Sequence, residues 1–229
     1  MWEQCFGQRP DTDDAIRFLA DLAGGRAVLE FGIGTGRLAL PLHAQGLVVH
    51  GIDNSAPMLE QLRGKPHGEE LAVTLGDFAT TTVDGSFGLV FVANHTLLAL
   101  TTQDAQVQCF LNAAAHLEPG GVFVVEVMSP YAGALENGGC RTVQVEEERV
   151  TLFLTVVDAI DQQMRGSGVC IRDRELPLVW TTASRYVWPS ELDLMARIAG
   201  LRLRDRWAGW NRQPFTAHDH AHVSVYELR

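Results

Sequence analysis

The stretch that decides the fold is Ala27-Val28-Leu29-Glu30-Phe31-Gly32-Ile33-Gly34-Thr35-Gly36-Arg37-Leu38-Ala39-Leu40-Pro41-Leu42. It opens with a short apolar run, reaches an acidic residue, places three glycines at alternate positions and continues with apolar residues at helical spacing. This order predicts a strand, a tight turn and a helix, with a ligand bound at the turn. Glycines suit such a turn because a residue without Cβ tolerates positive φ and lets backbone amides approach a ligand closely.

Apolar runs and amphipathic patterns alternate on both sides of this turn. The pattern predicts helices over 13–23, up to about 44, from 55 through 62, and over 103–117, and further strands over 47–53, 71–75, 87–93 and 122–128. Each strand is nearly continuous in apolar residues. Such strands alternating with helices are typical of a parallel sheet that is covered on both faces.

The pattern changes after the fifth strand. Three strand-like stretches, 142–145, 150–157 and 178–187, have turn residues between them at Gly166-Ser167-Gly168 and Asp173. A helix over 189–198 and strands over 201–210 and 222–228 follow. We predict a doubly wound, Rossmann-like α/β fold with a seven-stranded, mostly parallel sheet and an antiparallel β excursion between the fifth and the penultimate strand.

We expect residues 1–229 to form a single domain with three parts. The cofactor-binding α/β core covers 1–141, the antiparallel excursion over 142–188 is expected to lie over the mouth of the site, and 189–229 complete the core. The chain has 229 residues and a mass of 25.1 kDa, which is enough for one substantial core.

Composition and charge exclude several function classes. The formal net charge is −10 and the pI about 5.2, so a sequence-independent grip on nucleic acid is not expected. The sequence has no apolar run long enough to cross a bilayer, and we expect no membrane partner. Cys5, Cys109, Cys140 and Cys170 are far apart, which is typical of a reducing compartment, and we expect a cytoplasmic protein.

Two cofactors compete for the glycine turn. Gly34 to Ala39 satisfies the looser dinucleotide spacing, with Asp53 downstream as a ribose partner. Glu30, however, stands at the end of the strand, where it would repel a pyrophosphate and attract an ammonium group. Acidic residues at three strand ends, Glu30, Asp53 and Asp77, suit a ligand that carries amine, ribose hydroxyl and adenine amino donors. That ligand is S-adenosylmethionine.

Four motifs resemble, in order and separation, those of class I S-adenosylmethionine-dependent methyltransferases, the group to which we assign the chain by resemblance. They are Glu30-Phe31-Gly32-Ile33-Gly34-Thr35-Gly36, Gly51-Ile52-Asp53, Gly76-Asp77-Phe78 and Leu117-Glu118-Pro119-Gly120-Gly121. The resemblance covers roughly the first three-fifths of the chain. The tail, at Trp188-Pro189-Ser190-Glu191-Leu192 and His222-Val223-Ser224-Val225-Tyr226-Glu227, also resembles small bacterial methyltransferases.

The resemblance implies a role for each matching residue. It implies a floor of Gly32, Gly34 and Gly36 under the methionine part, Glu30 near the amino group, Asp53 at the ribose, Asn54 and Met58 beside the adenine, Asp77 and Phe78 at the adenine amino group and ring, and Asn94 with His95 at the methionine end. Two simpler interpretations stay open: Asp53 as a helix N-cap and Asp77 as a turn residue.

The expected activity is methyl transfer to a small-molecule acceptor, on oxygen or nitrogen in preference to carbon, by in-line displacement. His95 is a candidate general base, because imidazole titrates near neutral pH, or else it only lines the wall. Tyr186 and Trp210 are candidates for the acceptor pocket, or else core aromatics. His218, His220 and His222 alternate, but no other ligand is fixed nearby, and we expect no metal.

Two alternatives to a methyltransferase remain at this point. One is a protein of the same fold that binds S-adenosylmethionine without transferring its methyl group, and the other is an NAD(P)-dependent oxidoreductase. An exposed edge strand is compatible with either a monomer or a homodimer.

Overall fold

The computed structural model describes residues 9–128, 139–146, 149–173 and 175–229. Its main sheet has seven strands, in the spatial order β3 (Ala72–Leu75), β2 (Val49–Asp53), β1 (Val28–Phe31), β4 (Phe87–Val92), β5 (Leu117–Met128), β11 (Ala221–Leu228) and β10 (Leu201–Trp207). The first five are parallel, and β11 pairs antiparallel with both β5 and β10. The predicted doubly wound, mostly parallel sheet is therefore confirmed.

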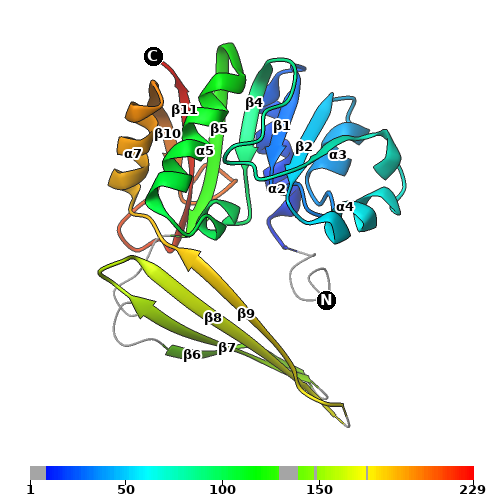
Figure 1. The fold of residues 1–229 in the computed structure, drawn as a ribbon, viewed down its shortest axis with the longest axis vertical. Helices are drawn as coiled ribbons and strands as arrows, with labels where there is room; N and C mark the ends of the chain where they lie inside the picture. Colours follow the sequence, from blue (N-terminus) through cyan, green and yellow to red (C-terminus); the bar gives the residue numbers. More distant parts are fainter. Residues whose placement is uncertain (1–8, 129–138, 147–148, 174) are drawn as a thin grey trace.

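Helices cover both faces of this sheet (Figure 1). One face packs against α5 (Gln103–His116) and α7 (Pro189–Ile198), and the other against α2 (Thr12–Ala23), α3 (Ala39–Ala44) and α4 (Ala56–Arg63). Along β5, Phe123 and Val125 join the first core while Val122 and Val124 join the second. This alternation arises because successive strand residues point to opposite faces, so both faces of the strand must be apolar.

The excursion is a four-stranded antiparallel sheet, which confirms the predicted insertion. Its strands are β6 (Gly139–Glu146), β7 (Arg149–Asp158), β8 (Gln163–Arg172) and β9 (Leu178–Arg185). Figure 1 shows it as a separate sheet below the ends of the main-sheet strands. Strand β9 contacts η2 (Thr96–Ala99), the short 3-10 helix that follows β4.

The turn expected at Gly166-Ser167-Gly168 is wrong, because these residues lie in the middle of β8. A Cβ at either glycine would collide with an aromatic side chain on a neighbouring strand, Phe153 beside Gly166 and Trp180 beside Gly168. The glycines are there to admit these rings, which is a known use of glycine inside strands.

Two local expectations also differ from the structure. The helix predicted over 103–117 ends at His116, and Pro119-Gly120-Gly121 belong to β5, where the pairing with β4 shifts register. The helix predicted over 13–23 begins at Thr12, and the carboxylate of Asp11 at its N-cap makes no cap hydrogen bond but accepts two hydrogen bonds from Arg9. In the first case pairing with β4 decides the outcome, and in the second a charged neighbour two residues away does.

A buried polar joint connects the second sheet to the core. Arg185, at the end of β9, donates to Gln106 of α5 (2.7 Å) and to Glu191 of α7 (2.7 Å). The side chains of Arg185 and Glu191 are 6% and 15% exposed, so this ion pair is largely shielded from water. Gln163 of β8 donates to the carbonyl of Thr101, close to the first turn of α5. The joint therefore holds the second sheet next to the segment that follows β4.

Candidate functional site: a pocket at the glycine turn

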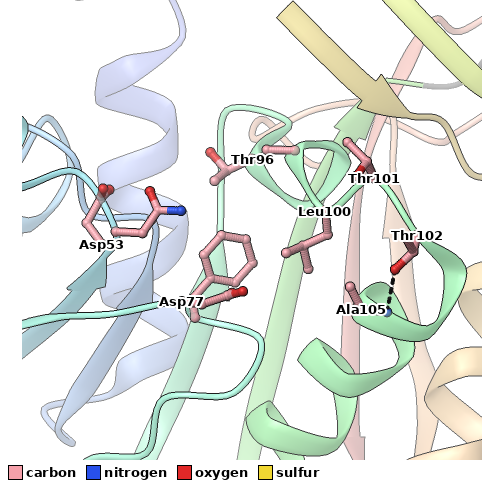
Figure 2. A pocket seen from close by; sticks show the side chains of 11 residues that line it. Asp53, Asp77, Thr96, Leu100, Thr101, Thr102 and Ala105 are labelled. Atoms are coloured by element: carbon pink, nitrogen blue, oxygen red, sulfur yellow. Dashed lines mark hydrogen bonds between the residues drawn. The ribbon is translucent and has the colours of Figure 1, made fainter.

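A pocket of about 280 Å³ lies where the parallel strands end. Its lining residues come from the turn after β1, the ends of β2 and β3, and the segment from β4 to α5: Gly32, Asp53, Asn54, Asp77, Phe78, Thr96, Ala99, Leu100, Thr101, Thr102 and Ala105. Figure 2 shows Asp53 on one side and Thr101 with Thr102 on the other, with Asp77 between them. Ligands of open α/β sheets bind at this edge.

The glycine turn after β1 is built on three positive φ angles. Gly32, Gly34 and Gly36 have φ values of 74°, 55° and 80°. Gly32 also has no room for a side chain, because an added Cβ would lie 2.5 Å from Cγ2 of Thr96. The alternate glycines are therefore required both by backbone conformation and, at Gly32, by close packing.

Asp53, the last residue of β2, ties the turn to its neighbour strand. Its Oδ2 accepts the backbone N–H of Gly34 (2.8 Å), and its Oδ1 accepts that of Ser55 (2.8 Å), next to the start of α4. The simpler interpretation of Asp53 as a helix N-cap is wrong, because Ser55 occupies the N-cap position of α4 and no side chain caps this helix. A carboxylate oxygen has two lone pairs, so both oxygens retain an acceptor position toward the pocket. Met58 lies behind the turn, with its sulfur 3.6 Å from a Cβ built on Gly34.

Asp77 and Phe78 form the wall after β3. Asp77 Oδ1 accepts the N–H of Ala79 (2.8 Å), as a turn residue does, while Asp77 itself lines the pocket. Phe78 is 6% exposed and stacks on Phe31 of β1, with ring centroids 5.9 Å apart. The stack fixes the ring and leaves one surface for a flat group in the pocket.

Glu30 lies behind the pocket wall, near the end of β1. Its side chain is buried, and Oε2 has no hydrogen-bond partner among the described residues. Burial raises the pKa of this carboxyl to about 8, against the opposing effect of the nearby Arg37 guanidinium. An unpartnered carboxyl oxygen at this depth fits a bound ammonium group, which would supply both a donor and a compensating charge.

Asn94 and His95 follow β4, and both have left-handed backbones, with φ of 55° and 59°. They do not line the pocket; the adjacent Thr96 does. The Nδ1 atom of His95 is buried and unpartnered within the described ranges. Burial lowers the pKa of His95 below its ordinary value, so its imidazole is neutral at pH 7.

Tyr186 and Trp210, the two residues proposed for the acceptor side, are both buried and neither lines this pocket. Tyr186 packs edge-on against Trp188 just after β9. Trp210 packs edge-on against Phe18 of α2, on the face of the main sheet that also carries α3 and α4.

Sequence reasoning missed two charged residues at this edge. Glu126 lies in β5, and Arg9, just before α2, donates to it (2.7 Å). Glu126 does carry a signal: it is the one carboxylate in Val122-Phe123-Val124-Val125-Glu126-Val127-Met128, and a charge in a buried strand must have a partner. Arg9 carries none, because its partners are determined by the fold. The wall residues that sequence reasoning missed are Thr96 and those in 99–105.

The structure also bears on metal and membrane binding. In the described ranges no group of three or more His, Cys, Asp or Glu side chains is arranged to hold a metal ion. His222 is fully buried in β11, whereas His218 and His220 are exposed in the loop before it. Among the helices that the structure describes, none is long and apolar enough to span a membrane.

Comparison with known proteins places the chain in a family. A model of the methyltransferase domain matches residues 28–121. The CcbJ methyltransferase from Streptomyces caelestis is 38% identical and superposes with a TM-score of 0.90, over 96% of this chain and 90% of that one. The cypemycin N-terminal methyltransferase of a Streptomyces species is 27% identical over 205 residues, 89% of this chain and 83% of that protein.

A third protein, an S-adenosylmethionine-dependent methyltransferase from Clostridium acetobutylicum, has the same fold at 15% identity (TM-score 0.85; 99% and 96% of the two chains). The chain belongs to the S-adenosylmethionine-dependent methyltransferases and is an enzyme of that family, with S-adenosylmethionine as its cofactor. The nicotinamide alternative is thereby excluded.

Proposed function

We propose that this enzyme methylates an amine nitrogen of a small molecule, with S-adenosylmethionine in the pocket at the glycine turn. The observation that carries the proposal is the set of acidic side chains around this pocket: Asp53 and Asp77 on its wall, and Glu30 behind it with its Oε2 atom unpartnered among the described residues. They match a ligand with hydroxyl, amino and ammonium donors. The name of the cypemycin N-terminal methyltransferase, which places the methyl group at an N-terminus, supports nitrogen as the acceptor atom.

The proposed roles follow the positions of the residues. Glu30 receives the ammonium group, Asp53 the ribose hydroxyls, and Asp77 with Phe78 the adenine. Asn54 lines the pocket beside Asp53, in keeping with a place near the adenine, and Met58 lies behind Gly34. Gly32, Gly34 and Gly36 form the floor. We assign Asn94 to the methionine end because it lies in the loop after β4, two residues before Thr96 on the wall.

The bound cofactor supplies an electrophilic methyl carbon, and the protein aligns the acceptor and removes water. An amine that arrives protonated would first have to lose a proton, which frees the nitrogen lone pair. The nitrogen would then take the methyl group while the sulfur keeps the electrons of the S–CH₃ bond. His95 is the proposed proton acceptor, because its imidazole is neutral and its Nδ1 atom is free of protein partners in the described part of the chain.

The acceptor space is expected beyond the methionine end, between the segment after β4 and the second sheet. The contact of β9 with η2 and the bond from Gln163 to Thr101 support this location. We also propose that the chain is one domain with the second sheet as its lid. Tyr186 lies next to the end of this sheet and remains a candidate for the acceptor side; Trp210 is the weaker candidate because it packs on α2.

The test is methyl transfer from labelled S-adenosylmethionine to matched pairs of small molecules that differ only in bearing an amine or a hydroxyl. We expect label on the amines, with one S-adenosylhomocysteine formed per methyl group transferred. Transfer confined to hydroxyls or carbon acids would overturn the choice of nitrogen and leave the family assignment intact.

A further inference from the structure

Glu126 connects three parts of the chain at the edge of the site. Its Oε1 accepts a hydrogen bond from Nη2 of Arg9 (2.7 Å), and its Oε2 accepts the backbone N–H of Asn94 (2.5 Å). The Glu126 side chain is 4% exposed. Arg9 also donates through Nη1 to Oδ1 of Asn94 (2.9 Å). The three residues therefore form a closed set of charge-assisted hydrogen bonds, which are about twice as strong as neutral ones.

The backbone that this set holds is strained. Asn94 and His95 are consecutive non-glycine residues with φ near +60°, a conformation that costs a residue with a Cβ about 1–2 kcal/mol. Such a pair persists only where the surroundings over-determine it. Within the described ranges, the N–H of Asn94 has no acceptor apart from Glu126 Oε2, so this one carboxylate oxygen is well placed to hold the turn.

The strained turn leads directly to the pocket wall. Thr96 follows His95, and its methyl group fills the space where Gly32 has no side chain. Thr96 and Gly32 both line the pocket. A change in the backbone at Asn94 and His95 would therefore move Thr96 against the floor on which the cofactor lies.

We propose that Glu126 is a positioning residue for the methyl-donor site, acting through the left-handed backbone of Asn94 and His95 to place Thr96 against Gly32. This rests on the cofactor of the family and not on the identity of the acceptor. Arg9 strengthens the arrangement by bridging Glu126 and the side chain of Asn94.

A purely structural role for Glu126, as a partner that neutralises Arg9, does not account for its hydrogen bond with the N–H of Asn94. Arg9 already has a carboxylate partner in Asp11, which accepts from Nε (3.0 Å) and Nη2 (2.7 Å). The ion pair therefore survives in part without Glu126, whereas Asn94 loses the acceptor of its N–H. If Glu126 only neutralises Arg9, the loss caused by Glu126→Ala should not depend on the residue at position 94. If Glu126 supports the left-handed backbone, the loss should become smaller when position 94 is glycine.

A double-mutant cycle measures that dependence, with the dissociation constant of S-adenosylhomocysteine determined by calorimetry. Because glycine adopts positive φ without strain, Asn94→Gly removes the strain at position 94 and leaves only that at His95, so less support is needed. We expect Glu126→Ala to weaken binding about tenfold in the wild-type background and at most about threefold in the Asn94→Gly background. Glu126→Gln keeps an oxygen for the Asn94 N–H and should weaken binding only about threefold.

Glu118→Gln is the matched control, since Glu118 pairs with Arg26 at the opposite end of the same strand. It should leave binding within about twofold of wild type, because exposed ion pairs contribute little. Equal losses on Glu126→Ala in both backgrounds, or a loss on Glu126→Gln as large as on Glu126→Ala, would overturn the proposal. If Glu126→Ala does not fold, the same cycle is run with Glu126→Leu, which also removes the acceptor of the Asn94 N–H but fills the space of the side chain. Absence of binding by the wild-type enzyme would instead contradict the proposed cofactor site.

Discussion

On one side of the pocket, Asp53 bonds to Gly34, 19 residues earlier in the chain; on the other, Glu126 bonds to Asn94 and Arg9, 32 and 117 residues earlier. The first pair joins two successive strand ends of one β-α-β unit. The second set joins a strand to a loop and to the segment before the first described helix. The side built from near neighbours shows in the sequence as a motif, whereas the side built from distant partners appears only after folding.

The largest effect on cofactor binding is expected at Gly32, where the locally built side of the pocket contacts Thr96 of the other side. Gly32→Ala introduces a Cβ 2.5 Å from Thr96 Cγ2 at a residue with φ of 74°. Overpacking of a rigid wall costs about 1–3 kcal/mol in addition to the backbone strain, so we expect binding of S-adenosylhomocysteine to weaken about 100-fold. Calorimetric titration measures it.

Gly24→Ala is the control for that prediction. Gly24 has φ of 57° at the end of α2, and an added Cβ would meet no atom within 4 Å. It should cost about 1 kcal/mol of folding free energy and leave binding within about twofold. Similar losses of binding in both variants would mean that strain, and not contact with Thr96, explains Gly32.

Asp53→Asn tests the locally built side. An amide has one acceptor oxygen, so it cannot accept from both Gly34 and Ser55 and also from a ribose hydroxyl. We expect S-adenosylhomocysteine to bind about 30-fold more weakly, as for loss of a hydrogen bond to a charged group. Asp84→Asn, at an exposed loop position, should leave affinity unchanged. A wild-type affinity for Asp53→Asn would remove Asp53 from the ribose site.

His95→Gln tests the general-base role of His95, on the side of the pocket that is built from distant partners. We expect kcat to fall about tenfold while the affinity for S-adenosylhomocysteine stays within about twofold, because a general base acts only on the reacting nitrogen. Near-normal turnover would exclude His95 as the base. The test requires an acceptor from the amine panel and steady-state kinetics with both substrates.

The pH dependence of that activity follows from the position of His95. Burial lowers the pKa of His95, Arg9 and Arg37 act in the same direction, and Glu126 and Asp11 oppose them. A base works in its neutral form, so activity is lost as the pH falls through this pKa. We therefore expect the acidic limb of kcat/KM to lie below pH 6.5 and to disappear in His95→Gln.

Glu30 predicts a proton release on binding. Its pKa is about 8 in the free protein, so at pH 7 the carboxyl is mostly protonated, and a bound ammonium favours the ionised form. We expect about one proton to be released per S-adenosylhomocysteine bound at pH 7, and none in Glu30→Gln. Calorimetry in buffers of different ionisation enthalpy measures it; a pH-independent affinity in the wild type would contradict the role of Glu30.

The Glu30 carboxyl also makes the free energy of unfolding depend on pH. A raised folded pKa means that the folded state keeps a proton that the unfolded state has lost, so this group lowers the free energy of unfolding as the pH rises from about 4.5 to 8. In Glu30→Gln that contribution to the slope should vanish. Urea denaturation of both proteins across this range provides the comparison.

The smallest effect on activity is expected at Trp210, which does not line the pocket. Trp210→Phe keeps an aromatic ring against Phe18 and should change acceptor kinetics by less than about twofold, with a small loss of stability. A large rise in KM for the acceptor would instead return Trp210 to the acceptor pocket.

The sequence by itself predicted the order of strands and helices in the α/β core, the glycine turn and the positions of Asp53, Asp77 and Phe78 on the pocket wall, but it missed β8 of the second sheet. These features depend on local periodicity and on strand ends that a parallel sheet brings to one edge. Residues such as Gly166 were misread because a glycine in a strand and a glycine in a turn have the same local signature, and only the rings of Phe153 and Trp180 distinguish them.

The tertiary structure alone decided what Glu30, Glu126 and Arg9 do. The pKa of Glu30 depends on complete burial, which no spacing in the sequence reports. The bonds of Glu126 to Arg9 and Asn94 exist because β5 lies beside β4 and because α2 begins at the same edge of the sheet. Local patterns determine elements, whereas charges buried between elements take whatever partners the packing brings within reach.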